Sequence, residues 1–401
     1  MSSNPINIKD YTIASEIAGT QQINDVRDFV LKNPLKLSQE ILRLVANQIS
    51  FNQNIISKIP SWSHIGGIIA PEKVSLEQSS SEWTAKYKSK LANGNNGLDL
   101  TGGLGVDAFF LSKNFKKYIH NEPNQLLSSI VAHNFKITGK SNTTFTQKKA
   151  EDFKIDSDID FIYLDPSRRN DNNHKMVGIQ DCSPDLRLML DKLITPGRTI
   201  MVKYSPMLDI KAALLLLKYV HQVLILSEKN EVKELVFLIE DTIIANPEVI
   251  CVNLTSKGEE QQFSFDFKQE SEANTIFSEP MAYLYEPNAS IMKAGAFKSV
   301  GNKFLLGKIA PNSHLYTSDI VLKEFPGRIF AIEKVLPFDK KILGAEVPSK
   351  KANISVRNFP LSVNEIKKQL NWQDGGEQYI FFTENSIKKK LVIICKKIHL
   401  T

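Results

Sequence analysis

A short apolar run in the first half of the chain ends in an acid and leads directly into a glycine-rich turn. Asp99 closes the run, and the turn contains Thr101, Gly102, Gly103 and Gly105. Glycines let a backbone approach a ligand closely, and a helix opening at Asp107 would direct free N–H groups at that ligand. Dinucleotide-binding turns read GxGxxG, whereas this one reads Asp-x-Thr-Gly-Gly-x-Gly. The spacing favours the methionine carboxylate and ribose of S-adenosylmethionine, with Asp99 accepting from the α-amino group.

Two more acids follow the next two predicted strands. Glu122 lies about 20 residues after the turn, where an acid can bind both ribose hydroxyls. Asp152 follows the third strand, where it would accept from the adenine amino group while Phe153 packs on the ring. An exposed loop carboxylate is the simpler interpretation of each acid alone. Three acids at three successive strand ends, in order, favour a cofactor of the nucleotide type.

A fourth predicted strand ends in Asp165-Pro166-Ser167, which is followed by Arg168 and Arg169. Asp-Pro is a common turn pair, so a plain turn is the alternative. Methylation of an exocyclic base nitrogen requires acceptors that orient the amino lone pair, not a strong base. The Asp165 carboxylate and the carbonyl after it would supply these acceptors, so we predict Asp165, Pro166 and Ser167 to be catalytic. Arg168 or Arg169 would stack on the unstacked base or hold its phosphate.

A fifth predicted strand ends in Lys203 and Tyr204, which we expect to line the substrate mouth at the same sheet edge. Cys182 has no histidine nearby in the pattern of a cysteine nucleophile, so we do not expect it to be catalytic. The three cysteines lie far apart without a CxxC pair, and no HxxxH pair occurs. The sequence therefore indicates no disulfide framework and no metal site, and it fits a reducing cytoplasm.

The elements that must position these residues alternate between strand and helix. Strands are predicted at 97–100, 117–121, 143–146, 161–164, 199–203, 222–227 and 234–240. Helices are predicted at 107–114, 124–135, 184–193 and 209–219. Such alternation predicts an α/β fold with a mostly parallel sheet and helices on both faces. Residues 228–233 are too few for a parallel crossover, so the last two strands must form a hairpin. A Rossmann-like sheet of seven strands with the last antiparallel is the architecture of class I methyltransferases.

The regions on either side of this core have different patterns. Residues 1–92 are predicted to be helical, with apolar residues at helical spacing over 35–49 and again over 76–91. After about residue 245 short strands and polar turns predict small α+β modules. Within the last of these, Ser362 and Glu365 fit a capping box for a helix over 362–370.

Composition and charge restrict the class of protein. The chain has 401 residues, 42% of them apolar, without an 18-residue apolar run or a secretory h-region at the N-terminus. We therefore expect several cores and no membrane partner. The net charge is +6, yet residues 291–401 hold 19 Lys and Arg against 9 Asp and Glu. A basic last third is typical of a module that binds a polyanion, although a solvated lysine-rich surface is the alternative.

The chain resembles the bacterial class I S-adenosylmethionine-dependent methyltransferases with a C-terminal THUMP-like domain. The resemblance spans nearly the whole chain and rests on the motifs at 76–88, 99–107, 165–169, 203–207, 285–295 and 350–359. It implies a helical region at 1–92, a methyltransferase domain at 93–245, a ferredoxin-like module at 246–329 and an RNA-guiding THUMP-like module at 330–401. Lys350, Lys351 and Arg357 would then bind RNA.

The glycine turn also looks like that of guanine-N2 methyltransferases of small-subunit ribosomal RNA. One departure concerns the catalytic motif. Amino-methyltransferases usually read Asp/Asn-Pro-Pro followed by an aromatic residue that stacks on the base. Here Ser167 replaces the second proline and Arg168 the aromatic residue. The methylated atom is therefore left open, and Arg168 is an alternative stacking plane.

The leading hypothesis is methyl transfer from S-adenosylmethionine to an RNA base, in particular an exocyclic amino nitrogen of rRNA or tRNA. One rival is a methyltransferase that acts on a protein or small molecule in the same pocket. The other is a non-catalytic RNA-binding assembly protein that keeps the methyltransferase fold. The acids and glycines of the expected cofactor site argue against this last rival.

Overall fold

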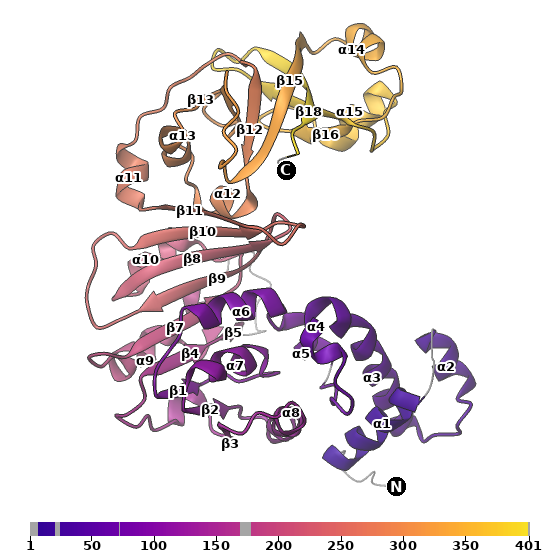
Figure 1. Cartoon of the computed structure of the whole chain (residues 1–401), viewed down its shortest axis with the longest axis vertical. Coiled ribbons are helices and arrows are strands. Elements are labelled where there is room, and N and C mark those ends of the chain that lie inside the picture. The colour runs from indigo at the N-terminus through magenta and orange to yellow at the C-terminus, as the bar shows by residue number, and fades with distance from the viewer. Residues whose placement is uncertain (1–6, 21–24, 72, 169–177, 400–401) are drawn as a thin grey trace. The chain divides into compact units, whose positions relative to one another are not determined.

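The computed structural model describes residues 7–20, 25–71, 73–168 and 178–399. The chain divides into two compact units (Figure 1). The first comprises 1–221 and 236–243, and the second comprises 222–235 and 244–401.

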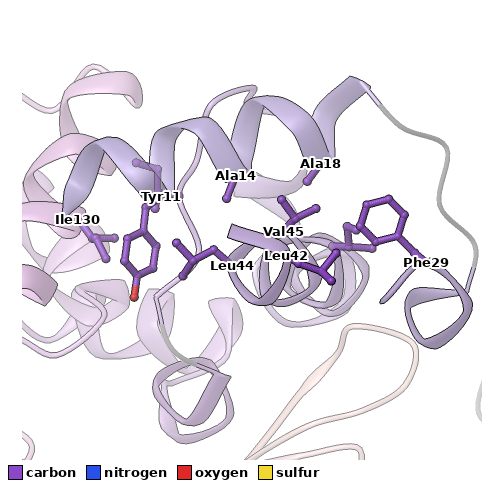
Figure 2. Packing of buried hydrophobic residues seen from close by; sticks show 10 residues of the cluster. Tyr11, Ala14, Ala18, Phe29, Leu42, Leu44, Val45 and Ile130 are labelled. Atoms are coloured by element: carbon purple, nitrogen blue, oxygen red, sulfur yellow. The ribbon is translucent and has the colours of Figure 1, made fainter. Parts of the chain in front are cut away.

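The first unit begins with helices, as predicted. They are α1 (Ile8–Thr20), α2 (Val26–Lys32), α3 (Gln39–Lys58), α4 (Pro60–Ser63), α5 (Lys73–Gln78) and α6 (Glu82–Lys90). Figure 2 shows Tyr11 and Ala14 of α1 packed toward Leu44 and Val45 of α3. Burial of these apolar faces holds the short helices together, since helices of this length are marginal alone.

Two helix boundaries differ from the sequence prediction. The helix expected over 35–49 starts later, because the Ser38 side chain caps α3 by accepting from the Ile41 N–H. The single helix expected over 76–91 is wrong. Residues 79–81 separate α5 from α6, and Ser81 caps α6 by accepting from the Thr84 N–H. This break places Ser80 between the two helices, where it enters the site described below.

The first sheet contains all seven predicted strands and two more. Its strands are β1 (Asn96–Asp99), β2 (Lys117–Asn121), β3 (Thr143–Thr146), β4 (Phe161–Leu164), β7 (Thr199–Tyr204), β8 (Val220–Glu228), β9 (Glu231–Ile239), β10 (Glu248–Leu254) and β11 (Glu260–Phe265). Their order is β11-β10-β8-β9-β7-β4-β1-β2-β3. The register of the parallel centre pairs Leu98 with Ile119 and with Ile162. Strand β10 runs parallel to β8, which extends the sheet beyond the predicted edge.

The predicted hairpin near residue 230 is confirmed. Strands β8 and β9 are neighbours in the sheet and are joined by Lys229 and Asn230 alone. Both residues have left-handed backbone, with φ of 52° and 64°. This is the conformation that two-residue hairpins require, because it matches the twist of the flanking strands.

Helices α7 (Val106–Leu111), α8 (Gln125–Ile137), α9 (Leu186–Leu193) and α10 (Ile210–Leu216) connect these strands. Three 3₁₀ turns and a small two-stranded sheet complete the connections. They are η1 (Ser112–Asn114), η2 (Ala150–Asp152), η3 (Ile179–Asp181), β5 (Ser167–Arg168) and β6 (Cys182–Ser183). The mostly apolar strands of the sheet centre are buried on both faces, as expected for parallel strands.

The second unit contains a seven-stranded sheet of its own. The strands are β12 (Tyr283–Pro287), β13 (Gly307–Lys308), β14 (Tyr316–Ser318), β15 (Gly327–Pro337), β16 (Asn353–Val356), β17 (Gln378–Glu384) and β18 (Lys390–Lys397). The helices are α11 (Phe267–Glu272), α12 (Ala289–Ala294), α13 (Ser299–Lys303), α14 (Lys340–Glu346) and α15 (Val363–Leu370). The predicted capping box of Ser362 and Glu365 is confirmed at the start of α15. Within the described part of the chain, no helix has the length and apolarity that crossing a bilayer requires.

Candidate active site

The carboxyl ends of neighbouring parallel strands meet at one edge of the first sheet and bring the predicted acids together. Glu122, after β2, accepts from the Gly103 N–H at 3.0 Å and from the Asn124 N–H at 2.8 Å. The Thr101 hydroxyl accepts from the Asp165 N–H at 2.6 Å. The glycine turn is therefore hydrogen-bonded both to Glu122 and to the Asp-Pro motif, at the edge where open α/β sheets have their binding crevice.

The glycine turn needs two of its glycines for packing as well as for any ligand. A Cβ added at Gly102 would lie 2.3 Å from the His120 ring. Gly105 has a left-handed φ of 77°, and a Cβ there would lie 2.7 Å from Val131. His120 is fully buried beneath the turn, and burial lowers its imidazole pKa to about 4. The turn therefore rests on a neutral imidazole that only a glycine can accommodate.

Gly102→Ala is expected to lower the free energy of unfolding by about 1–3 kcal/mol, the range for overpacking a filled site. The physical cause is the clash of the new methyl with the His120 ring. Urea unfolding of both proteins measures the difference. The double variant G102A/H120A should recover part of the loss, because the smaller side chain vacates the space. A double variant no more stable than G102A would contradict this account.

Asp107 lies in the first turn of α7, where the sequence placed a helix start, and its side chain is paired inside the protein. Gly105 is the N-cap of α7, and the Asp107 carboxylate is buried inside the first unit. Its Oδ1 lies 2.8 Å from Lys88 Nζ, and its Oδ2 accepts from Ser80 Oγ at 2.8 Å and from the Tyr163 hydroxyl at 2.6 Å. A buried carboxylate must be paired, and here the protein supplies the partners.

Lys88 is the participant that residue-by-residue reading of the sequence did not single out. It lies on α6, which packs beside α7 (Figure 1), and its side chain is 0% exposed. Its ammonium donates to Ser80 Oγ at 2.8 Å and lies 5.7 Å from the centre of the Tyr163 ring. The sequence did contain a signal for its burial. Lys88 follows Thr84 by four residues and Ala85 by three, so the three side chains share one helix face, and all three are fully buried.

These contacts determine the charge state of Asp107. Burial by itself would raise its pKa, but the ammonium groups of Lys88 and Lys203 outweigh that effect. The pKa of Asp107 is thereby lowered to about 2. The Asp107 carboxylate is consequently charged in the folded protein near neutral pH.

Lys203, which the sequence placed at the substrate mouth, pairs with Asp165. Lys203 Nζ lies 2.5 Å from Asp165 Oδ2, 3.4 Å from Ser80 Oγ and 3.9 Å from Asp107 Oδ2. Tyr204 is buried too, with its ring 5.5 Å from that of Phe237. Lys203 and Tyr204 are successive residues of β7, so their side chains point to opposite faces of the sheet.

Asp165 keeps 35% of its side chain exposed although Lys203 is beside it. Desolvation raises its pKa, and the Lys203 ammonium opposes that rise. The ion pair uses Oδ2, and within the described ranges no hydrogen-bond donor is assigned to Oδ1. Asp165 thus combines a fixed position with an available acceptor oxygen.

The rest of the Asp-Pro motif enters the small sheet of β5 and β6. Pro166 is buried, whereas Ser167 is exposed with its hydroxyl 3.5 Å from the Ser183 carbonyl. The backbone of Arg168 pairs with Cys182. Arg169, predicted to bind substrate, lies outside the described residues. Cys182 is buried.

The predicted adenine side of the site is more open. Asp152 ends η2 with an exposed side chain, and Phe153 is half-buried. Lys148 Nζ lies 5.6 Å from the centre of the Phe153 ring. The edge that carries Asp99, Glu122 and Asp165 therefore continues into an aromatic surface.

Asp99 provides a test of whether a cationic cofactor fits. It is buried, and its carboxylate accepts from the Thr101 N–H at 3.0 Å. Burial, followed by the nearby carboxylates of Asp107, Asp165 and Glu122, raises its pKa well above the usual value. An ammonium and a sulfonium, the two cationic groups of S-adenosylmethionine, are what this accumulation of negative charge would accept. The residues therefore fit the cofactor expected from the sequence.

In the second unit, the three residues expected to bind RNA are in different situations. Lys350 and Lys351 are exposed before β16. Arg357 instead donates to Oε1 of the buried Glu286 at 2.7 Å, and Arg328 Nε donates to Oε2 of the same carboxylate at 2.6 Å. Glu286 lies on β12 and Arg328 on β15, so the guanidinium of Arg357 is engaged in holding this sheet together.

Comparison with known proteins identifies the modules of the second unit and the chain as a whole. Residues 283–326 match a ferredoxin-like domain family, and residues 327–397 match a THUMP domain-like family. The crystal structure of a candidate methyltransferase from Porphyromonas gingivalis W83 is similar over 98% of this chain and 100% of that chain. Their sequence identity is 30% and the TM-score is 0.86. None of the curated proteins matches the chain.

Two further solved structures are similar over smaller parts. A candidate class I S-adenosylmethionine-dependent methyltransferase from Listeria monocytogenes is 11% identical, with 63% of this chain and 92% of that chain covered and a TM-score of 0.39. A modification subunit of a candidate type I restriction enzyme from Vibrio vulnificus YJ016 is 12% identical, with 61% and 63% covered and a TM-score of 0.36. Both TM-scores are too low to bear on this chain. The full-length match and the two domain families show that the chain belongs to the class I S-adenosylmethionine-dependent methyltransferases with a C-terminal THUMP-like domain.

Proposed function

We propose that this methyltransferase transfers its methyl group to an exocyclic amino nitrogen of an RNA base. The observation that carries the proposal is the Asp165–Lys203 pair, 2.5 Å apart, at the strand edge beside the glycine turn. The pair holds a carboxylate in place and leaves Oδ1 as an acceptor. An amino group that donates to this oxygen would direct its lone pair away from Asp165 and toward the methyl group.

S-Adenosylmethionine supplies, when bound, a methyl group on a sulfonium. The proposed cofactor contacts are Asp99 for the α-amino group, Glu122 for the ribose, and Asp152 with Phe153 for the adenine. The backbone of the turn at Gly102, Gly103 and Gly105 would lie against the methionine part. Positioning and electrostatics are sufficient for this reaction, because the acceptor nitrogen already carries a lone pair.

The affinity for S-adenosylmethionine is expected to rise with pH. Burial raises the pKa of Asp99, whereas a bound cationic ligand favours the charged carboxylate and lowers that pKa. Binding should therefore release protons, and the affinity should level off above the pKa of Asp99 in the free protein. Calorimetry over a pH series, in buffers of different ionisation enthalpy, measures both effects.

The matched variant for this prediction is Asp99→Asn, which should bind more weakly and with a flatter pH dependence. The stability of the free protein depends on pH in the opposite direction from the cofactor affinity. A raised Asp pKa contributes stability that is lost as pH rises from the usual Asp value of about 3.9 through the folded value. Wild-type affinity that falls with pH would remove Asp99 from the cofactor site.

RNA is the proposed substrate class because of the C-terminal module. Residues 327–397, the part that matches the THUMP domain-like family, contain 14 Lys and Arg against 7 Asp and Glu. Such an excess suits a polyanion. We also propose that the protein acts in the cytoplasm, since its three cysteines are buried and form no disulfide within the described residues.

Methyl transfer from labelled S-adenosylmethionine to total RNA tests the proposal. RNA from a strain lacking this protein should accept label, and RNA from the wild-type strain should not, because its target is already methylated. Digestion of the labelled RNA to nucleosides then identifies the base. If neither RNA accepts label while calorimetry shows cofactor binding, RNA is not the acceptor, and a protein or small-molecule acceptor becomes the leading alternative.

The contribution of the THUMP-like module is better tested by neutralising charges than by deletion. Strand β15 begins at the module boundary and pairs with β12 from Tyr283 to Pro287, so deletion would expose β12. We expect K350Q/K351Q to weaken RNA binding and leave cofactor affinity unchanged. The control K192Q/K218Q removes two exposed lysines from the first unit. Equal RNA affinity of both double variants would argue against a role for Lys350 and Lys351.

A further inference from the structure

An aromatic pair with lysines around it lies on the first unit, in residues that the proposed reaction does not use. Phe109 and Phe110 end helix α7, and their rings pack edge to face at 5.1 Å. Trp62 of α4 packs edge to face on Phe109 at 5.3 Å. Both phenylalanines are buried, so neither ring is available for stacking on a base.

Three lysines from three different elements cover these rings. Lys113 of η1 lies 4.8 Å from the centre of the Phe110 ring and 5.4 Å from that of Phe109. Lys140, after α8, lies 4.7 Å from the centre of the Phe109 ring. Lys86 of α6 lies 5.7 Å from the Phe110 ring. Cation–π attraction and burial of the aliphatic stems explain why lysines are held there.

The charge of two of these lysines is not compensated. Lys86 has Glu82 at 2.5 Å, but within the described ranges no carboxylate lies at ion-pair distance from Lys113 or Lys140. Partial burial and the repulsion from Lys113 lower the pKa of Lys140 to about 8. Two ammonium groups thus share the Phe109 ring and repel each other. An anion between or beside them would relieve the repulsion.

We propose that Lys113 and Lys140 form a phosphate-binding site on the methyltransferase core, and that it takes a backbone phosphate of the RNA substrate. The proposal rests on the proposed function, because that function supplies the polyanion. Contacts to phosphate do not distinguish one base from another, and the buried rings of Phe109 and Phe110 cannot contact a base. The site would therefore position the RNA on the core, while base selection occurs elsewhere.

The salt dependence of RNA binding tests this site. Labelled polyuridylate is titrated with wild-type protein, K113Q/K140Q and the control K192Q/K218Q over a range of salt concentrations. For K113Q/K140Q the slope of log affinity against log salt should become shallower by about 0.7 for each phosphate no longer neutralised. The control should keep the wild-type slope. A K113Q/K140Q slope equal to that of the control would overturn the proposal.

Amine labelling gives a second readout in the wild-type protein, independent of how the variants fold. At pH 8 the lowered pKa leaves a larger share of Lys140 as the reactive free amine than the usual lysine pKa of about 10.4 would leave. An acylating reagent, read out by mass spectrometry, should modify Lys140 faster, and polyuridylate should protect it. Protection by inorganic phosphate alone would show an anion site without preference for RNA, which overturns the assignment to RNA.

The two proposals fail in different ways. Suppose that RNA accepts methyl groups, that polyuridylate does not protect Lys140, and that K113Q/K140Q binds polyuridylate with the salt dependence of the wild-type protein. Only the proposed phosphate site is then wrong. If polyuridylate protects Lys140 while no RNA accepts label, only the proposed methyl acceptor is wrong. Absence of any RNA binding would overturn both.

Discussion

Replacing Asp165 by Ala is expected to lower methyl transfer by about 10²–10³-fold, the usual effect of removing one preorganised polar contact to the reacting group. The affinity for S-adenosylmethionine should stay close to that of the wild-type protein. Asp165 reaches the proposed cofactor edge through its backbone N–H, which binds Thr101 Oγ1, and that contact survives the substitution. Single-turnover kinetics and calorimetry measure the two quantities separately.

Two matched variants refine the prediction for Asp165. Asp165→Asn keeps a carbonyl acceptor but loses the charge that pairs with Lys203, so its rate should lie between those of wild type and D165A. Lys203→Met keeps the carboxylate but frees it to move, and should lower kcat more than it raises KM. A D165A protein with wild-type kcat would remove Asp165 from the proposed mechanism.

Lys88→Met is expected to lower the free energy of unfolding by about 3–5 kcal/mol, the cost of leaving one member of a buried ion pair alone. Lys88 is 0% exposed and lies 2.8 Å from Asp107 Oδ1. Its loss would leave Asp107 with Lys203 as the remaining cation, 3.9 Å away. Chemical denaturation measures the difference.

Lys86→Met is the matched control, two residues earlier on the same helix. Lys86 is 53% exposed, and its partner Glu82, 12% exposed, keeps the hydrogen bond from the Ser61 N–H when Lys86 is replaced. The loss should therefore be smaller than for Lys88. The double variant K88M/D107N should be more stable than K88M, since it removes the unpaired charge as well. A K88M protein as stable as K86M would show that the pair does not contribute to folding.

The Asp107 contribution has a defined pH range. Its folded pKa of about 2 lies below the unfolded value of about 3.9, so the stabilisation is present above pH 3.9 and is lost as pH falls toward 2. In K88M the loss of stability between pH 3.9 and pH 2 should be smaller, because the Lys88 ammonium, which lowers the pKa of Asp107 most, is gone.

Local patterns were sufficient to predict the elements of the methyltransferase core. The strand at 117–121, the strand at 161–164 and the hairpin near residue 230 all lie where apolar runs and short connections placed them. The same reasoning predicted that the acids at the strand ends would meet at one edge of the sheet, because the carboxyl ends of parallel strands lie on one side. The contact between Thr101 and Asp165, 64 residues apart, shows that edge assembled.

The tertiary structure decided what each charged side chain touches. Asp107, Lys203 and Arg357 each contact an oppositely charged residue of the protein itself, and the sequence did not predict these partners. Lys88 joins the site from a helix that precedes the sheet. Its spacing from Thr84 and Ala85 places it on the buried face of that helix, but the partner of its charge comes from a distant segment. Strand order and helix position along the sheet follow from periodicities in the sequence. The partner of a buried charge instead depends on which distant segment is packed over it, because a charge removed from water must find its counter-charge in three dimensions.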